Sequence, residues 1–135
     1  ENSGAVSIID SDVTSCSARN GGVVSAVSSG AVSIINSDVS GCSADNQGGV
    51  VYAHQNSGAV SISGSTVSGC SAGDEGGVVY ARESESLSIA GVDFIDNRAG
   101  GSGSVLYLDK THPSISAASF TGNTAGDDND DATIE

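Results

Sequence analysis

One six-residue block is written five times along this chain, and this repetition constrains the fold more than any single residue. The copies begin at Val13, Val39, Val67, Phe94 and Phe120, so their starts lie 26, 28, 27 and 26 residues apart. Three copies read Val-x-x-Cys-Ser-Ala, and the last two read Phe-x-x-Asn-x-Ala. A fixed period of this length is typical of a solenoid, in which each repeat forms one rung and buries its apolar face only against its neighbours.

The composition favours a thin all-β core. The chain has 135 residues, with 19 glycines, no tryptophan and no methionine, and its apolar residues are mostly valine, isoleucine and alanine. β-Branched residues suit strands. Serine and glycine are also abundant, as in disordered tracts, but a disordered tract has no reason to keep apolar residues in phase. The length indicates a single domain over 1–135.

Each rung divides into three segments. The first, at 4–9 and its copies, alternates so that Val6 and Ile8 point inward. Its outward positions form a serine column: Ser7, Ser33, Ser61, Ser88 and Ser114. The second segment is the repeated block, with a two-residue bend after its first apolar residue. The third segment opens with Gly-Gly, as at 48–53.

The third segment predicts an apolar stripe on the surface. Its last column (Val27, His54, Arg82 and Asp109) is mostly polar, so alternation places the tyrosines and the first valines outside. We call these residues the Tyr/Val stripe: Tyr52, Tyr80, Tyr107, Val23, Val50, Val78 and Val105. Such a stripe usually marks a contact, although stacked aromatic residues also stabilise a sheet by themselves.

These segments predict an all-β parallel β-helix of about five rungs, each with three strands. Rungs would lie about 4.8 Å apart. The chain begins and ends at the same point of the rung, without a capping helix, so we expect either part of a longer solenoid or a subunit that stacks end to end.

Phe94-x-x-Asn97 and Phe120-x-x-Asn123, alternating with Gly-Gly-Val-Val-Tyr, resemble the Phe-x-x-Asn and Gly-Gly-Ala-Ile repeats of chlamydial polymorphic outer membrane proteins. The resemblance covers essentially the whole chain. It implies a right-handed, pectate-lyase-like β-helix in a secreted or cell-surface protein. In the first three rungs valine replaces the phenylalanine and cysteine replaces the asparagine, so an internal asparagine ladder would become a cysteine ladder.

The cysteines at this position, Cys16, Cys42 and Cys70, should stack inside the rod. Three outcomes are open: a column of buried thiols, one disulfide that leaves one thiol, or a metal site. Side-by-side parallel strands point their Cβ atoms the same way, which favours thiols. No Cys-x-x-Cys spacing supports zinc.

An acidic loop near the C-terminus is the alternative metal site. Its carboxylates could hold calcium, which takes several oxygen ligands, but the loop lacks the pattern of a known calcium repeat, so we predict no cofactor. The residues concerned are Asp127, Asp128, Asp130 and Asp131.

Charge excludes some partners. Seventeen acidic residues against four basic ones give a net charge of −13, which makes nucleic acid and anionic membrane surfaces poor partners. No apolar run approaches the roughly 20 residues that span a bilayer.

The sequence predicts no enzyme, because its few basic residues lie at different positions of the rung and so form no cluster. Lyases and hydrolases need clustered carboxylates, or a base with nearby cations. Arg19, Arg82, Arg98 and Lys110 lie at different rung positions, and no Ser/His/Asp set is recognisable.

We therefore expect a non-enzymatic structural or adhesive element of a secreted or cell-surface protein. It would self-associate through the Tyr/Val stripe or through the serine/alanine face, which is the serine column together with the neighbouring Ala5, Ala31 and Ala59. The alternative is a β-helix that binds or depolymerises carbohydrate, with the tyrosines as stacking platforms. A third possibility is ice binding by the flat serine/alanine face, although threonine is scarce.

Overall fold

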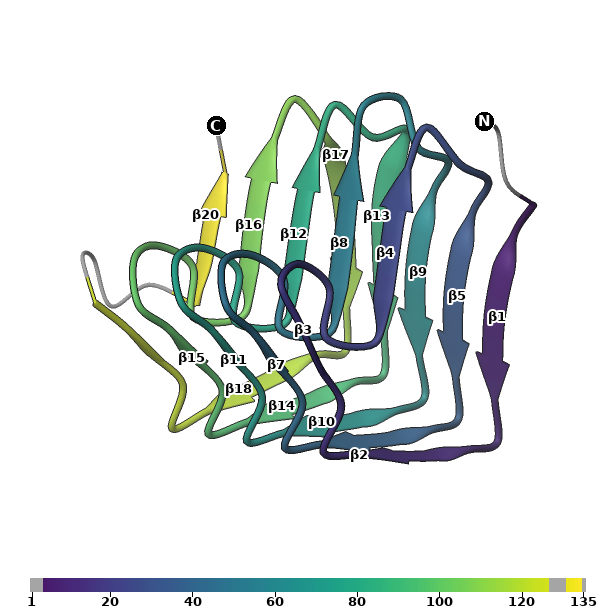
Figure 1. The fold of residues 1–135 in the computed structure, drawn as a ribbon. Helices are drawn as coiled ribbons and strands as arrows, with labels where there is room; N and C mark the ends of the chain where they lie inside the picture. Colours follow the sequence, from purple (N-terminus) through teal and green to yellow (C-terminus); the bar gives the residue numbers. More distant parts are fainter. Residues whose placement is uncertain (1–3, 127–130, 135) are drawn as a thin grey trace.

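The computed structural model describes residues 4–126 and 131–134. Within them the chain forms a parallel β-solenoid of five rungs, and every strand pairs with strands of the neighbouring rungs (Figure 1). The predicted all-β solenoid is confirmed. The number of strands per rung was wrong, because each rung has four strands rather than three.

The strands form four five-stranded sheets, which we call A to D in the order that the chain visits them. Sheet A comprises β1 (Val6–Ile9), β5 (Val32–Ile35), β9 (Val60–Ser63), β13 (Ser86–Ala90) and β17 (His112–Ser116). Sheet B comprises β2 (Asp12–Thr14), β6 (Asp38–Ser40), β10 (Thr66–Ser68), β14 (Asp93–Ile95) and β18 (Ser119–Thr121). Sheet C comprises β3 (Ser17–Ala18), β7 (Ser43–Ala44), β11 (Ser71–Ala72), β15 (Arg98–Ala99) and β19 (Thr124–Ala125). Sheet D comprises β4 (Val24–Val27), β8 (Val51–His54), β12 (Val79–Arg82), β16 (Leu106–Asp109) and β20 (Ala132–Ile134).

The fourth sheet arises because the repeated block is two strands joined by a sharp turn. The third residue of each block has a left-handed backbone, with φ of 55° at Ser15, 61° at Gly41 and 53° at Asp96. This conformation turns the chain between sheets B and C. The bend was predicted, but the two residues beyond it form a separate sheet.

The inner columns of sheet A are buried as predicted. Val32, Ile34, Val60 and Ile62 are at most 1% exposed. In register with them, Val6 of the first rung is 41% exposed, because it has a neighbouring rung on one side only.

The valine half of the Tyr/Val stripe does not lie on the surface. Val50, Val78 and Val105 are completely buried, and Val23 is half-buried. The backbone N–H groups of Val50 and Val51 both donate to the carbonyl oxygen of Val78, at 2.8 and 2.9 Å. Two consecutive residues therefore share one acceptor, as in a bulge, and alternation across the sheet starts only after this point. Both valines of each pair consequently face the core.

Each of these corners begins with two glycines that have different roles. Gly48 has φ of +67°, a conformation that favours glycine. Gly49 is needed for space, because a Cβ atom there would lie 2.1 Å from the carbonyl oxygen of Gly77 in the next rung. The Gly-Gly signature thus sets the close approach of successive rungs.

Candidate functional site

The tyrosines of sheet D form a continuous stack. Ring centroids of Tyr52 and Tyr80 are 5.3 Å apart with 10° between the planes, and those of Tyr80 and Tyr107 are 5.3 Å apart with 2°. Parallel rings at this distance are too close to lie edge to edge in one plane, so they stack face against face with an offset. The ring faces therefore cover one another, and Tyr80 is only 5% exposed. The tyrosines are the part of the Tyr/Val stripe that lies outside the core.

Polar groups surround this stack. The Nε of Arg82 is 2.9 Å from Oδ2 of Asp109, and the His54 ring lies 5.8 Å from that of Tyr52. Burial raises the pKa of Tyr80, and a hydrogen bond with Arg82 opposes that shift. Arg82 therefore has two partners beside the tyrosine stack, the carboxylate of Asp109 and the hydroxyl of Tyr80.

A polar hollow of about 500 Å³ lies where sheet D turns into sheet A. Its lining residues are Ser29, Asn56, Ser57, Gly58, Glu83, Ser84, Glu85 and Lys110. The ammonium group of Lys110 lies 3.2 Å from Oε1 of Glu83, and this contact lowers the pKa of that carboxyl. The turn beside the hollow has left-handed φ at both Gln55 and Asn56, where the rung is longest. The hollow is open and mixed in charge.

The cysteine column is a ladder of free thiols. Cys42 and Cys70 are completely buried, and Cys16 in the first rung is half-buried. The thiols of Cys42 and Cys70 donate weakly to the carbonyl oxygens of Ser40 and Ser68, at 3.6 and 3.5 Å. Burial raises the pKa of Cys70 to about 12 and also raises that of Cys42. Neutral, desolvated thiols of this kind are unreactive and pack as small apolar groups.

An asparagine ladder continues the cysteine ladder into the last two rungs. Asn97 is completely buried, and its Nδ2 donates to the carbonyl oxygen of Val67 at 3.0 Å. The backbone N–H of Asn97 in turn donates to Oδ1 of Asn123 at 2.9 Å. Beside it, the Phe94 and Phe120 rings stack with centroids 5.2 Å apart. The two ladders hold the turn between sheets B and C.

Two further hydroxyl ladders were missed by the sequence analysis. At the turn from sheet A to sheet B, Ser37 Oγ accepts from the N–H of Ser11 and donates to the carbonyl oxygen of Ile35. At the turn from sheet D to sheet A, the hydroxyls of Ser57 and Ser84 lie 2.9 Å apart. A serine two positions after the strand in each of the first three rungs of sheet A (Ser11, Ser37 and Ser65) was the available signal, but exposed serines have the same spacing.

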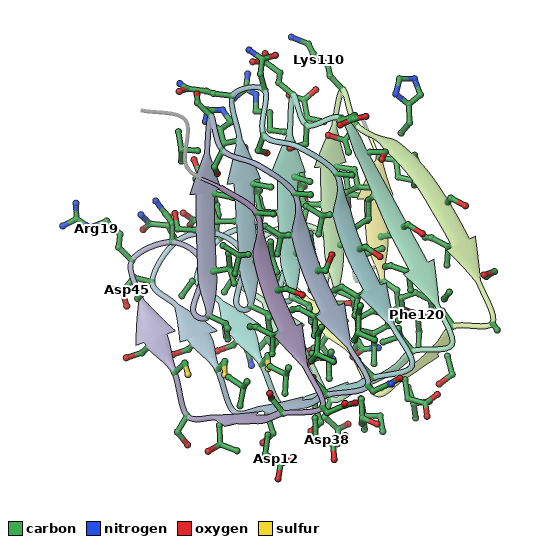
Figure 2. The ribbon with its side chains drawn as sticks, turned by 90° about the vertical axis from the view of Figure 1, so that its right-hand side faces the viewer. Asp12, Arg19, Asp38, Asp45, Lys110 and Phe120 are labelled. Atoms are coloured by element: carbon green, nitrogen blue, oxygen red, sulfur yellow. The ribbon has the colours of Figure 1, made fainter. Side chains whose placement is uncertain are left out.

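The outer side of sheet A, which we call the A face, carries no Asp, Glu, Lys or Arg side chain. It consists of three columns of outward side chains. They are Ala5, Ala31, Ala59, Ser86 and His112; then Ser7, Ser33, Ser61, Ser88 and Ser114; then Ile9, Ile35, Ser63, Ala90 and Ser116. By contrast, sheet B carries Asp12 and Asp38 in its outer column, and both side chains point away from the ribbon in Figure 2.

Of the four aspartates considered for metal binding, only one lies among the described residues. Asp127, Asp128 and Asp130 lie outside the described residues. Asp131 is described, and its Oδ1 accepts a hydrogen bond from the Ser104 hydroxyl at 3.0 Å. Among the residues that the structure describes, no three His, Cys, Asp or Glu side chains are grouped as metal ligands.

The basic residues are distributed over the rod. Arg19 and Lys110 lie at different corners in Figure 2, and Arg98 lies on sheet C. In the described part of the chain, no helix is long and apolar enough to cross a membrane. Comparison with protein-family models, with curated proteins and with solved structures finds no match in any of the three.

Proposed function

We propose that this chain is a non-enzymatic structural element, a rod that self-associates within a secreted or cell-surface assembly. The observation that supports this most is the position of the side chains that are best suited to chemistry or recognition. The cysteines, the tyrosines, and Asn97 with Asn123, which are among the residues best suited to chemistry or recognition, are stacked in ladders that join rung to rung. Regular ladders of this kind stiffen a rod along its length.

The winding fits this role. All sixteen strand pairings are parallel and in register, and the strands at either end of the described rod have one free edge. A further rung, from the same protein or from a second copy, would continue the four sheets by backbone hydrogen bonds. We also propose right-handed winding, as the resemblance to the chlamydial repeats implies and as crossovers between parallel strands nearly always show.

A carbohydrate-binding role has less support. Stacked sugars need open aromatic faces, whereas the faces of Tyr80 are covered by Tyr52 and Tyr107. The polar hollow beside Lys110 is the remaining place for a glycan. A glycan array would settle this, because binding to several related sugars would favour the alternative.

Electron microscopy of the concentrated protein tests the structural role. We expect rods joined side by side or end to end. Dispersed single particles at every concentration, or turnover of acidic polysaccharides, would contradict it.

A further inference from the structure

We infer that the A face binds the A face of a second copy of this chain. This inference rests on the proposed structural role and names the surface through which the rods associate. Charge is the first reason. The chain carries 17 acidic and four basic residues, yet the strands of sheet A contain no Asp, Glu, Lys or Arg. Two rods with this net charge repel each other in most relative orientations. Contact through their A faces keeps the carboxylates of the two copies apart.

The other sheets do not offer this. One of the two outer columns of sheet B includes Asp12, Asp38 and Asp93 in register. Sheet C carries Arg98, and sheet D carries Arg82 and Asp109. A copy placed against any of these would have to desolvate charge.

Shape is the second reason. The bulky side chains of the A face are unevenly placed: Ile9, which is 51% exposed, and Ile35 lie in the first two rungs, while Ala90 and Ser116 occupy the same column in the last two. A two-fold axis along the strands of sheet A, through β9, puts Ile9 opposite Ser116 and Ile35 opposite Ala90.

A two-fold axis along the rod puts each isoleucine opposite an alanine of the same rung instead. Either symmetric dimer therefore sets large side chains against small ones, which is the self-complementarity that an isologous interface needs.

Hydrogen bonding is the third reason. The hydroxyls of Ser33, Ser61 and Ser88 run along the centre of the A face, and within the described chain these side chains have no hydrogen-bond partner. They can donate and accept across the interface, either directly or through water. A face of serine, alanine and isoleucine thus supplies apolar contact at its margins and hydrogen bonds along its midline.

The size of the face predicts a weak contact. Five strands about 4.8 Å apart, each contributing about five residues of about 3.3 Å, cover about 400 Å² per copy. The two copies bury about 800 Å² together, which is below the range of about 1,200–2,000 Å² for stable complexes. Association should therefore rise steeply with concentration, and it becomes persistent where many rods act together.

Disulfide trapping tests the inference. Ser61 lies in the middle strand and the middle column, so either two-fold axis places Ser61 opposite its own copy. S61C should form covalent dimers under mild copper–phenanthroline oxidation at high protein concentration. Ser68→Cys is the matched control, because Ser68 is a half-buried serine of the same rung with uncharged neighbours, Ser40 and Ile95, but faces outward from sheet B. The wild type sets the background, since Cys16 is its one half-exposed thiol.

A second pair of cysteine variants, at Ser33 and Ser88, distinguishes a defined interface from random collision. S33C alone should form dimers if the rods are parallel, and a mixture of S33C and S88C should form mixed dimers if they are antiparallel. The inference is overturned if S61C dimerises no faster than S68C, or if neither S33C alone nor the mixture of S33C and S88C cross-links. Should the wild type still associate in that case, another face joins the rods and the proposed structural role survives. A wild type that stays monomeric at every concentration contradicts both.

Discussion

The backbone N–H of Cys70 donates a 2.9 Å hydrogen bond to the side-chain Oδ1 of Asn97 in the next rung. This bond joins the cysteine ladder to the asparagine ladder. It also explains why both residue types occupy one position. A thiol fills the space and reaches the preceding rung only by a weak 4.0 Å contact with a carbonyl oxygen, whereas an amide also accepts from a backbone N–H of that rung.

Asn97→Ala should therefore be strongly destabilising. The change leaves the buried N–H of Cys70 without its partner and removes the side-chain donor to the carbonyl oxygen of Val67, and we expect a loss of about 3 kcal/mol in the free energy of unfolding. Asn123→Ala removes the equivalent bond to the N–H of Asn97 at the half-buried end of the ladder, so it should also destabilise the rod, by about 1 kcal/mol or more. Urea denaturation measures both, and an Asn97→Ala protein as stable as the wild type would contradict the role of the ladder.

Substitution of Gly49 tests the close approach of successive rungs. The added Cβ of Gly49→Ala would meet the backbone oxygen of Gly77 at 2.1 Å, and we expect a loss of at least about 3 kcal/mol or failure to fold. In Gly69→Ala nothing lies within 4 Å of the new atom, so only its left-handed φ is strained, at about 1 kcal/mol. Thermal unfolding of both variants tests this ranking. A Gly49→Ala protein as stable as Gly69→Ala would show that the rungs can separate.

The Gly-Gly corner also shows where alternation fails as a guide. Period-two patterns predicted the inner columns of sheet A correctly, because strands of four residues contain two full alternations. Val50 precedes its strand at a bulge, and nothing in the residue types marks that shift. Sheet C was missed for a related reason, because strands of two residues are too short to show a period.

Tyr80 tests whether the aromatic stack is structural. Tyr80→Ala removes the central ring and should cost about 3 kcal/mol. Tyr80→Phe keeps both stacking contacts and should cost about 1 kcal/mol or less. Chemical denaturation compares them. If Tyr80→Ala leaves stability unchanged but abolishes binding to a glycan, the carbohydrate alternative gains.

The buried thiols predict a dependence on alkaline pH. In the unfolded chain cysteine ionises near pH 8.5, whereas burial raises the pKa of Cys70 to about 12. The native state therefore holds its proton more tightly. The stabilising effect is complete below about pH 8.5 and is lost as the pH rises toward 12, by up to about 1.4 kcal/mol per pH unit for this thiol.

Urea midpoints at pH 7.5 and pH 10.5 measure this loss, with Cys70→Ala as the comparison. The wild type should lose more stability than the variant over that interval. An identical pH dependence in the two proteins would show that the Cys70 thiol does not remain neutral in the folded rod.

Sedimentation velocity across a wide concentration range tests the central claim, that this chain is a rod that associates through its A face. The wild type should sediment faster as its concentration rises. Ser61→Glu places two like charges opposite each other at the centre of the contact and should weaken association at least about a hundredfold, while Ser68→Glu on sheet B should not. A wild type that sediments as a monomer throughout, or a Ser61→Glu variant that associates as strongly as the wild type, would contradict the account.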